Sequence, residues 1–180
     1  EILDILWVGK LDFRKQLTLA LKSISTVNNK NIRLHIIGAG ESSTYKEIAK
    51  QYSISDLCVW HGMLSHQEVQ YLMQNSDLLL FTSVAEGTPH VVLEAISNGL
   101  TVLCFDTCGQ GDSVNEKVGI KIPLSNPEQS VNDFAEKINY LYYNRAVLKQ
   151  LSENCAARQI ELSWDKKAEQ MLELYKRMVN

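Results

Sequence analysis

Proline and glycine are scarce in this 180-residue sequence, and neither sign of charge dominates it. With 3 prolines and 9 glycines, the chain is neither collagen-like nor of low complexity. Its 18 basic and 21 acidic side chains give a net charge of -3, which excludes the overall positive field that recruits nucleic acid or anionic membranes. The longest apolar run, from Asp77 to Ser83, is far shorter than the roughly 20 residues of a membrane-spanning helix. We therefore expect a globular chain with no nucleic-acid partner and no membrane span, so any bound anion must be held locally.

The sequence also has no cysteine pair of the C-x-x-C type. Its four cysteines lie mostly inside apolar runs, at Cys58, Cys104, Cys108 and Cys155. Such positions favour reduced thiols of a core over disulfides or metal ligands, and reduced thiols are typical of cytoplasmic proteins. No charged and then apolar leader opens the chain, so we expect no export. The chain starts without methionine inside an apolar run, which suggests a piece of a longer protein.

Short apolar runs of strand length alternate with segments of helical periodicity. The runs are Ile5–Val8, Leu34–Ile37, Leu57–Trp60, Asp77–Phe81, Thr101–Phe105 and a weaker one at Gly119–Ile122. Because most of them are continuously apolar, both faces of their sheet must be covered, as in a parallel sheet between helices. Three helical stretches follow, at Val131–Tyr143, Ala146–Ile160 and Trp164–Met178. The sequence thus predicts an α/β fold: a doubly wound parallel sheet of about six strands, helices on both faces and a helical C-terminal end.

The segment after the fourth run has the pattern of an anion site at a helix start. Thr88 suits the N-cap and Pro89 the first helical position. We expect the first free N–H groups of the helix, on His90, Val91 and Val92, to point, with the positive end of the helix dipole, toward the carboxyl edge of the sheet. Ligands of doubly wound sheets bind at that edge. The pattern therefore predicts a phosphate site.

Two carboxylates flank this helix start. Glu86 lies just before it, where an acid can bind a ligand or simply stabilise the helix terminus. Glu94 lies about one and a half turns inside an apolar helix, where a charged group normally has a hydrogen-bond partner from the protein or a ligand. We favour a ligand hydroxyl as the partner of Glu94.

A basic cluster follows the first run, within the loop that leads to the next helix. Lys10 and Lys15 could neutralise a pyrophosphate at the same edge of the sheet, whereas Arg14 fits a solvated turn. Gly38-Ala39-Gly40 begins like a dinucleotide fingerprint, but serine stands at the third glycine position. No P-loop, no G-x-S-x-G elbow and no Asp-x-Asp pair is present. The histidines have no metal-ligand spacing, so we expect no metal site and assign His35, His61 and His66 to packing or the surface.

These motifs together resemble the GT4 family (glycosyl transferases group 1), in the C-terminal, nucleotide-sugar-binding domain of a GT-B fold. Glu86 and Glu94 match its E-x7-E signature, and Gly87-Thr88-Pro89 resembles its Glu-Gly-x-Pro variant. The segment from Val8 to Lys15 is similar to the family's Val-Gly-Arg-Leu…Lys element, and Val59 to Leu64 to its Phe-x-Gly-x-Val element. The resemblance covers nearly the whole chain and implies one Rossmann-like donor-binding domain over residues 1–180.

The resemblance also implies a role for each matching residue. Glu86 would contact the transferred sugar as the catalytic residue that orients the donor and stabilises charge. The implied donor-binding residues are Lys10 and Lys15 on the diphosphate, Glu94 on the ribose, Leu64 beside the base, and the backbone of Gly87, Thr88, Pro89, His90 and Val91 on phosphate and sugar oxygens. Departures from the family pattern are Lys10 for arginine, Gln16 for glycine and Cys108-Gly109 for Gly-Gly.

The implied function is the donor half of a retaining, metal-independent glycosyltransferase without a cofactor. Its substrate would be a UDP- or GDP-linked hexose-type sugar, transferred to a saccharide or glycolipid acceptor of a bacterial surface polysaccharide. The N-terminal acceptor-binding domain is absent from this chain, so we expect the isolated domain to be inactive. The whole protein would be cytoplasmic or peripheral to the inner face of the membrane.

Two alternatives remain open from the sequence. A nucleotide-sugar epimerase or hydrolase on the same fold would share the phosphate site and add acid and base residues. A non-catalytic module of the receiver or flavodoxin type is disfavoured, because a receiver needs clustered aspartates and only Asp12 is suitably placed.

Overall fold

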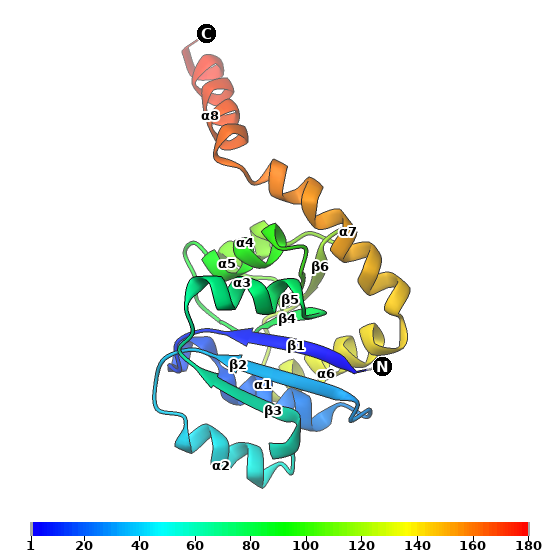
Figure 1. The fold of residues 1–180 in the computed structure, drawn as a ribbon. Helices are drawn as coiled ribbons and strands as arrows, with labels where there is room; N and C mark the ends of the chain where they lie inside the picture. The colour runs from blue at the N-terminus through cyan, green and yellow to red at the C-terminus, as the bar shows by residue number, and fades with distance from the viewer. Residues whose placement is uncertain (1, 180) are drawn as a thin grey trace.

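The predicted strands form one six-stranded parallel sheet in the computed structural model, which describes residues 2–179 (Figure 1). The strands are β1 (Leu3–Val8), β2 (Ile32–Ile37), β3 (Cys58–Gly62), β4 (Leu78–Phe81), β5 (Thr101–Phe105) and β6 (Gly119–Ile122). Their spatial order is β3-β2-β1-β4-β5-β6, and every neighbouring pair is parallel. The order reverses between β1 and β4, which makes the carboxyl ends of these two strands the switch point where doubly wound sheets bind ligands.

Helices cover both faces of the sheet, as the continuous apolar strands require. The helical elements are η1 (Phe13–Lys15), α1 (Leu17–Thr26), α2 (Ser43–Gln51), η2 (Ser55–Leu57), α3 (His66–Gln74), α4 (His90–Ser97), α5 (Cys108–Ser113), α6 (Pro127–Tyr143), α7 (Arg145–Glu161) and α8 (Trp164–Val179). One core joins one face of the sheet to α1 and α6, and a second core joins the other face to α3 and α4. Alternate residues of β1 serve the two cores: Ile5 and Trp7 belong to the first, and Leu6 to the second. Full burial of each such side chain stabilises the fold by about 1.5–3 kcal/mol.

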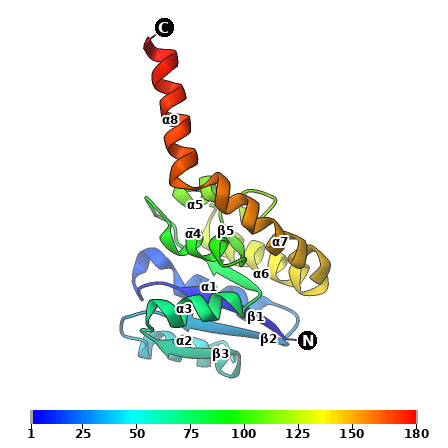
Figure 2. The same cartoon turned by 45° about the horizontal axis from the view of Figure 1, so that its top comes forward.

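The C-terminal helices behave in two different ways. Helix α7 returns along the sheet and buries Leu148, Leu151 and Cys155. Helix α8 instead projects away from the domain (Figures 1 and 2). Its large apolar side chains, including Trp164 and Leu174, are exposed. Within residues 2–179, no helix has the length and apolar character to cross a bilayer.

The structure corrects two local predictions. Helix α4 begins at His90, with Pro89 rather than Thr88 in the N-cap position and no side-chain cap. The reason is that Pro89 has ψ 74° and lies against α5, where a Cβ on Gly109 would meet Pro89 Cδ at 2.7 Å. Helix α5 itself was not predicted, because its sequence Cys-Gly-Gln-Gly-Asp-Ser has neither apolar periodicity nor good helix formers.

All four cysteines are free, and three of them are partly or fully buried as expected. Burial raises the pKa of the Cys58 and Cys155 thiols to about 11 and that of Cys104 to about 12. Cys108 is the exception, because its side chain is exposed at the start of α5 and its φ is +52°. The prediction of a core thiol is therefore wrong for Cys108.

Candidate functional site

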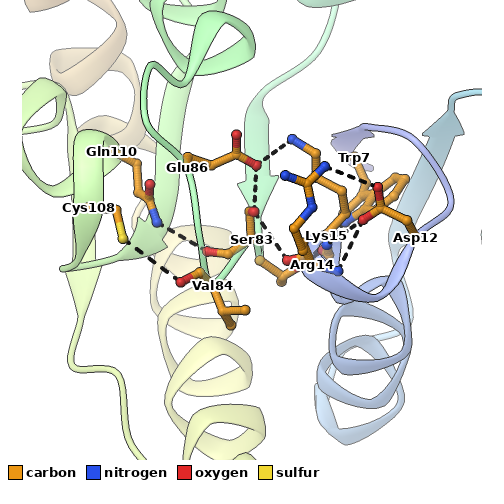
Figure 3. A network of polar contacts seen from close by, with 10 residues as sticks. Trp7, Asp12, Arg14, Lys15, Ser83, Val84, Glu86, Cys108 and Gln110 are labelled. Carbon is orange, nitrogen blue, oxygen red and sulfur yellow. Dashed lines mark hydrogen bonds and ion pairs between the residues drawn. The ribbon is translucent and has the colours of Figure 1, made fainter.

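The switch point holds an ion pair between Lys15 and Glu86. Lys15 ends the short turn η1, whose preceding residue Asp12 accepts hydrogen bonds from the backbone N–H groups of Arg14 (3.0 Å) and Lys15 (3.4 Å). Gln16 then adopts a left-handed conformation with φ 53°, and α1 begins after it. This turn directs the Lys15 ammonium across the sheet edge to Glu86, where Nζ lies 2.5 Å from Oε1 (Figure 3).

Residues after β4 hold the Lys15 turn in place through its backbone. Thr82 Oγ1 donates toward the carbonyl oxygens of Lys15 (2.8 Å) and Gln16 (3.1 Å) and accepts from the indole N–H of Trp7 at 3.1 Å. The N–H of Val84 donates to the Arg14 carbonyl at 3.1 Å. The ends of β1 and β4 are therefore tied together, and the Lys15–Glu86 pair lies over this tie.

Glu86 is ionised in this setting. Burial raises the pKa of its carboxyl, but hydrogen bonds from Lys15 and Ser83 and the charges of Lys15 and Arg14 lower it by more, so the pKa lies below the ordinary glutamate value. Ser83 Oγ lies 2.6 Å from the same oxygen, Oε1, that Lys15 contacts. No hydrogen bond to Oε2 is formed within residues 2–179, which leaves that oxygen free to accept one. A carboxylate with a lowered pKa is suited to orienting and charge stabilisation rather than to proton abstraction near neutral pH.

The loop from Glu86 to Pro89 packs on α5. The N–H of Gly109 donates to the Glu86 carbonyl at 3.3 Å, and a Cβ on Gly109 would lie 2.2 Å from the Gly87 carbonyl oxygen. The position therefore needs glycine for this close approach. Cys108 adds a long contact of 3.9 Å from its Sγ to the Val84 carbonyl (Figure 3).

The free backbone donors at this site differ from those that the sequence predicts. The N–H of His90 donates to the Thr88 carbonyl at 3.0 Å, and that of Val92 to the Pro89 carbonyl at 2.9 Å. Among the described residues, the N–H groups of Gly87, Thr88 and Val91 have no acceptor. The expectation for His90 and Val92 was thus wrong, since the irregular loop before α4 uses these groups internally, while Val91 stays available as predicted.

Three other predicted site residues make no hydrogen bond or ion pair with Lys15 or Glu86. Glu94 is half-buried in α4, and its carboxylate has no protein partner within residues 2–179. Lys10 is exposed on the turn after β1, which docks on the loop after β2 through a hydrogen bond from Leu11 N–H to the Ala39 carbonyl (2.9 Å). Leu64 is half-buried and lines a groove of about 380 Å³ together with His61 and residues of α3.

A second cavity, of about 280 Å³, opens at the ends of β2 and β3 and contains residues that the sequence did not single out as a group. It is lined by Gly38, Gly40, Ser42, Lys46, Trp60 and His61, among others. His61 hydrogen-bonds to His35 at 2.9 Å, and burial together with the neighbouring His35 lowers the pKa of His61. The sequence also did not identify Thr82, Ser83 or Gln110; the S-x-x-E spacing of Ser83 and Glu86 was the one available signal. Within the described part of the chain, no three His, Cys, Asp or Glu side chains gather as metal ligands would.

Comparison with known proteins matches residues 3–158 to the family described as glycosyl transferases group 1. The chain is 34% identical over 101 residues to protein CapJ of Staphylococcus aureus, covering 54% of this chain and 26% of that protein. It is 33% identical over 110 residues to the lipopolysaccharide 1,6-galactosyltransferase of Salmonella typhimurium, covering 59% and 30%. The chain thus spans less than a third of the length of these two relatives in the matched regions.

Solved structures agree with the family match. Sucrose-phosphate synthase from Thermosynechococcus elongatus superposes with a TM-score of 0.83 at 20% identity, over 99% of this chain and 46% of that one. The Staphylococcus aureus protein TarM, solved in complex with UDP among other ligands, superposes with a TM-score of 0.79 at 19% identity, over 97% and 36%. These similarities show the fold, a Rossmann-like domain of the kind that forms the C-terminal half of GT-B enzymes. The chain belongs to the glycosyl transferases group 1 (GT4) family.

Proposed function

We propose that this chain is the donor-binding half of a retaining, metal-independent glycosyltransferase that uses a UDP- or GDP-linked hexose. The observation that carries the proposal is the Lys15–Glu86 pair at the switch point, beside the free N–H groups of Gly87, Thr88 and Val91. A cation and unpaired amides on one side, and an ionised carboxylate with one free oxygen on the other, suit a sugar joined to a diphosphate.

The proposed chemistry breaks the bond between sugar C1 and the diphosphate and forms a bond from C1 to an acceptor hydroxyl oxygen. Negative charge develops on the leaving diphosphate, where Lys15, Lys10 and the loop amides stabilise it. Because the pKa of Glu86 is lowered, we assign Glu86 to accept a hydrogen bond from a sugar hydroxyl through Oε2. The proton of the acceptor hydroxyl then passes to the departing diphosphate on the same face, which retains the configuration at C1.

The nucleoside end of the donor fits residues farther along the edge. We assign Glu94 to the ribose hydroxyls, because its half-buried carboxylate has no partner within residues 2–179 and a buried charge needs one. The base would lie beside Leu64. The UDP found with TarM supports a uridine donor, and the similarity to a lipopolysaccharide galactosyltransferase supports a hexose and a surface-polysaccharide acceptor.

The acceptor-binding domain of the whole enzyme would precede this chain. The lengths of the relatives support this organisation, and so does α8, whose exposed apolar side chains project from the domain. We propose that α8 packs on that N-terminal domain, and that the whole protein acts in the cytoplasm, at the inner face of the membrane when its acceptor is a glycolipid.

Binding of UDP, GDP and ADP to this chain, followed by amide chemical shifts, tests the proposal. We expect UDP or GDP at millimolar concentration to shift the amides of Gly87, Thr88 and Val91, and Lys15→Met to weaken this binding at least tenfold. We expect no sugar transfer by the chain alone. The absence of shifts with all three nucleotides would refute the donor site, and product analysis of the full-length protein separates transfer from epimerisation or hydrolysis.

A further inference from the structure

Two hydrogen-bond donors contact the same carboxylate oxygen of Glu86, and the function proposed above gives a role to only one of them, Lys15. Lys15 Nζ and Ser83 Oγ both contact Oε1, at 2.5 and 2.6 Å. Ser83 also lies 3.2 Å from the Arg14 carbonyl, but a hydroxyl has a single proton. The proton goes to the carboxylate, because that contact is shorter and charge-assisted, and because the Arg14 carbonyl already accepts from the N–H of Val84.

Ser83 has a single proton and is fixed inside the fold, whereas Lys15 keeps protons that Glu86 does not use. Ser83 is 1% exposed, two residues after the end of the buried strand β4. Its carbonyl accepts a hydrogen bond from Gln110 Nε2 at 3.1 Å, and Gln110 is itself fully buried in α5 (Figure 3). The Lys15 side chain is 16% exposed and lies over the Phe81 ring, but its ammonium has three protons, of which Glu86 engages one.

A bound diphosphate would act on the two donors differently. Phosphate oxygens compete for the Lys15 ammonium, so Glu86 shares this charge once the donor is present. Arg14 is mostly exposed and pairs with Asp12 at 3.4 Å, so it offers little replacement. The Ser83 hydroxyl lies in the interior, bonded to Glu86, and stays with it.

On the basis of the proposed function, we propose that Ser83 is a positioning residue. It keeps its hydrogen bond to Oε1 of Glu86 while the donor diphosphate competes for the Lys15 ammonium, so that Oε2 stays directed at the transferred sugar. Ser83 therefore acts through Glu86 and does not touch the phosphates. Its removal affects Glu86 most when the site is occupied.

The test measures the pKa of the Glu86 side chain by carbon NMR, in this chain free and saturated with inorganic pyrophosphate. The variants are S83A, S83T, which keeps the hydroxyl, and the control S23A, which removes another fully buried hydroxyl bonded to the Leu19 carbonyl. We expect pyrophosphate to raise the Glu86 pKa in every variant and by the largest amount in S83A. S83T and S23A behave like the wild type, and S83A changes the pyrophosphate affinity by less than about twofold, because no phosphate contact is lost.

In the full-length enzyme with a UDP-hexose that proves to be its donor, S83A lowers kcat about tenfold and leaves KM for the donor nearly unchanged. An equal Glu86 pKa in wild type and S83A with pyrophosphate bound overturns the assignment. If pyrophosphate does not bind at all, the donor site itself is refuted. The Glu86 pKa of S83A is then compared with that of wild type in the free protein, and equal values overturn the role of Ser83.

Discussion

Gly109→Ala probes the close packing between α5 and the loop before α4. The new Cβ would lie 2.2 Å from the Gly87 carbonyl oxygen and 2.7 Å from Pro89 Cδ, whereas contacts of a real Cβ stay above 3.0 Å. The neighbouring backbone must therefore withdraw by about 0.8 Å. Because the Gly109 N–H also holds the Glu86 carbonyl at 3.3 Å, this movement displaces the whole segment that carries the free amides of Gly87 and Thr88.

The mutation should also lower the stability of the fold. The 2.2 Å contact is to a backbone atom, which cannot rotate away as a side-chain end can, so we expect the usual overpacking cost of about 1–3 kcal/mol. Helix propensity offsets little of this cost, because Gly109 is the second residue of the short helix α5. Such a destabilisation lowers Tm by about 12 °C at most for a chain of this size. If these amides bind the donor phosphates as proposed, UDP binding also weakens, because the loss of one charge-assisted amide hydrogen bond to a phosphate lowers affinity about tenfold.

Thermal unfolding and UDP titration of the wild type and two variants measure both effects. The matched control is Gly111→Ala in the same helix, where the nearest atom to the new Cβ is the end of the exposed Asp106 side chain at 3.0 Å. We expect G109A to bind UDP about tenfold more weakly than G111A. Equal affinity of G109A and wild type, or an equal loss in G111A, would refute the link between this packing and the proposed donor site.

Three further predictions concern other parts of the chain. Glu94→Gln should leave the free energy of unfolding within about 0.5 kcal/mol of wild type, because Glu94 has no partner within residues 2–179, while calorimetry should show UDP affinity falling about tenfold. Lys15→Met should raise the Glu86 pKa. A carboxyl whose pKa is lowered by folding stabilises the fold above its unfolded-state pKa, and this stabilisation is lost as pH falls through its folded-state pKa. Urea unfolding should therefore show a smaller stability loss below pH 4.5 in K15M than in wild type, and an unchanged pH dependence would contradict the ion pair. Deleting α8 from Trp164 onward should leave Tm within about 2 °C, because its side chains described by the structure are exposed, and a larger drop would show that α8 supports this domain.

The strands were predictable because each is a continuous apolar run of the right length. Strands β5 and β6 have the predicted bounds, whereas each of the other four has at least one end shifted by one or two residues. Longer amphipathic helices such as α6 were predictable for the same reason, although α6 starts at Pro127 because Asn126 caps it through the Gln129 N–H. Helix α5 was not predicted, because tertiary packing against the loop before α4, rather than local helix propensity, forms it.

The site was predictable only in part. The spacing of Glu86 and Glu94 and the position of Lys15 after the first strand pointed to one edge, and the structure joins Lys15 to Glu86 there. The set of free amides could not be deduced, because it depends on the irregular backbone at Pro89. The role of Thr82 depends on contacts across 67 and 66 positions, which no pattern in the sequence gives. The role of Ser83 depends on the rotamer of Glu86, and the S-x-x-E spacing was the one signal for it.

The tie between β1 and β4 has a consequence for how such a site can diversify. Its hydrogen bonds are accepted by the backbone carbonyl oxygens of Arg14, Lys15 and Gln16, and every amino acid has such a carbonyl. Side chains at Lys10, Phe13 and Arg14 point into solvent and take no part in it. Substitutions at these positions, by evolution or design, can therefore change the charge near an approaching anion while the backbone beneath keeps its conformation.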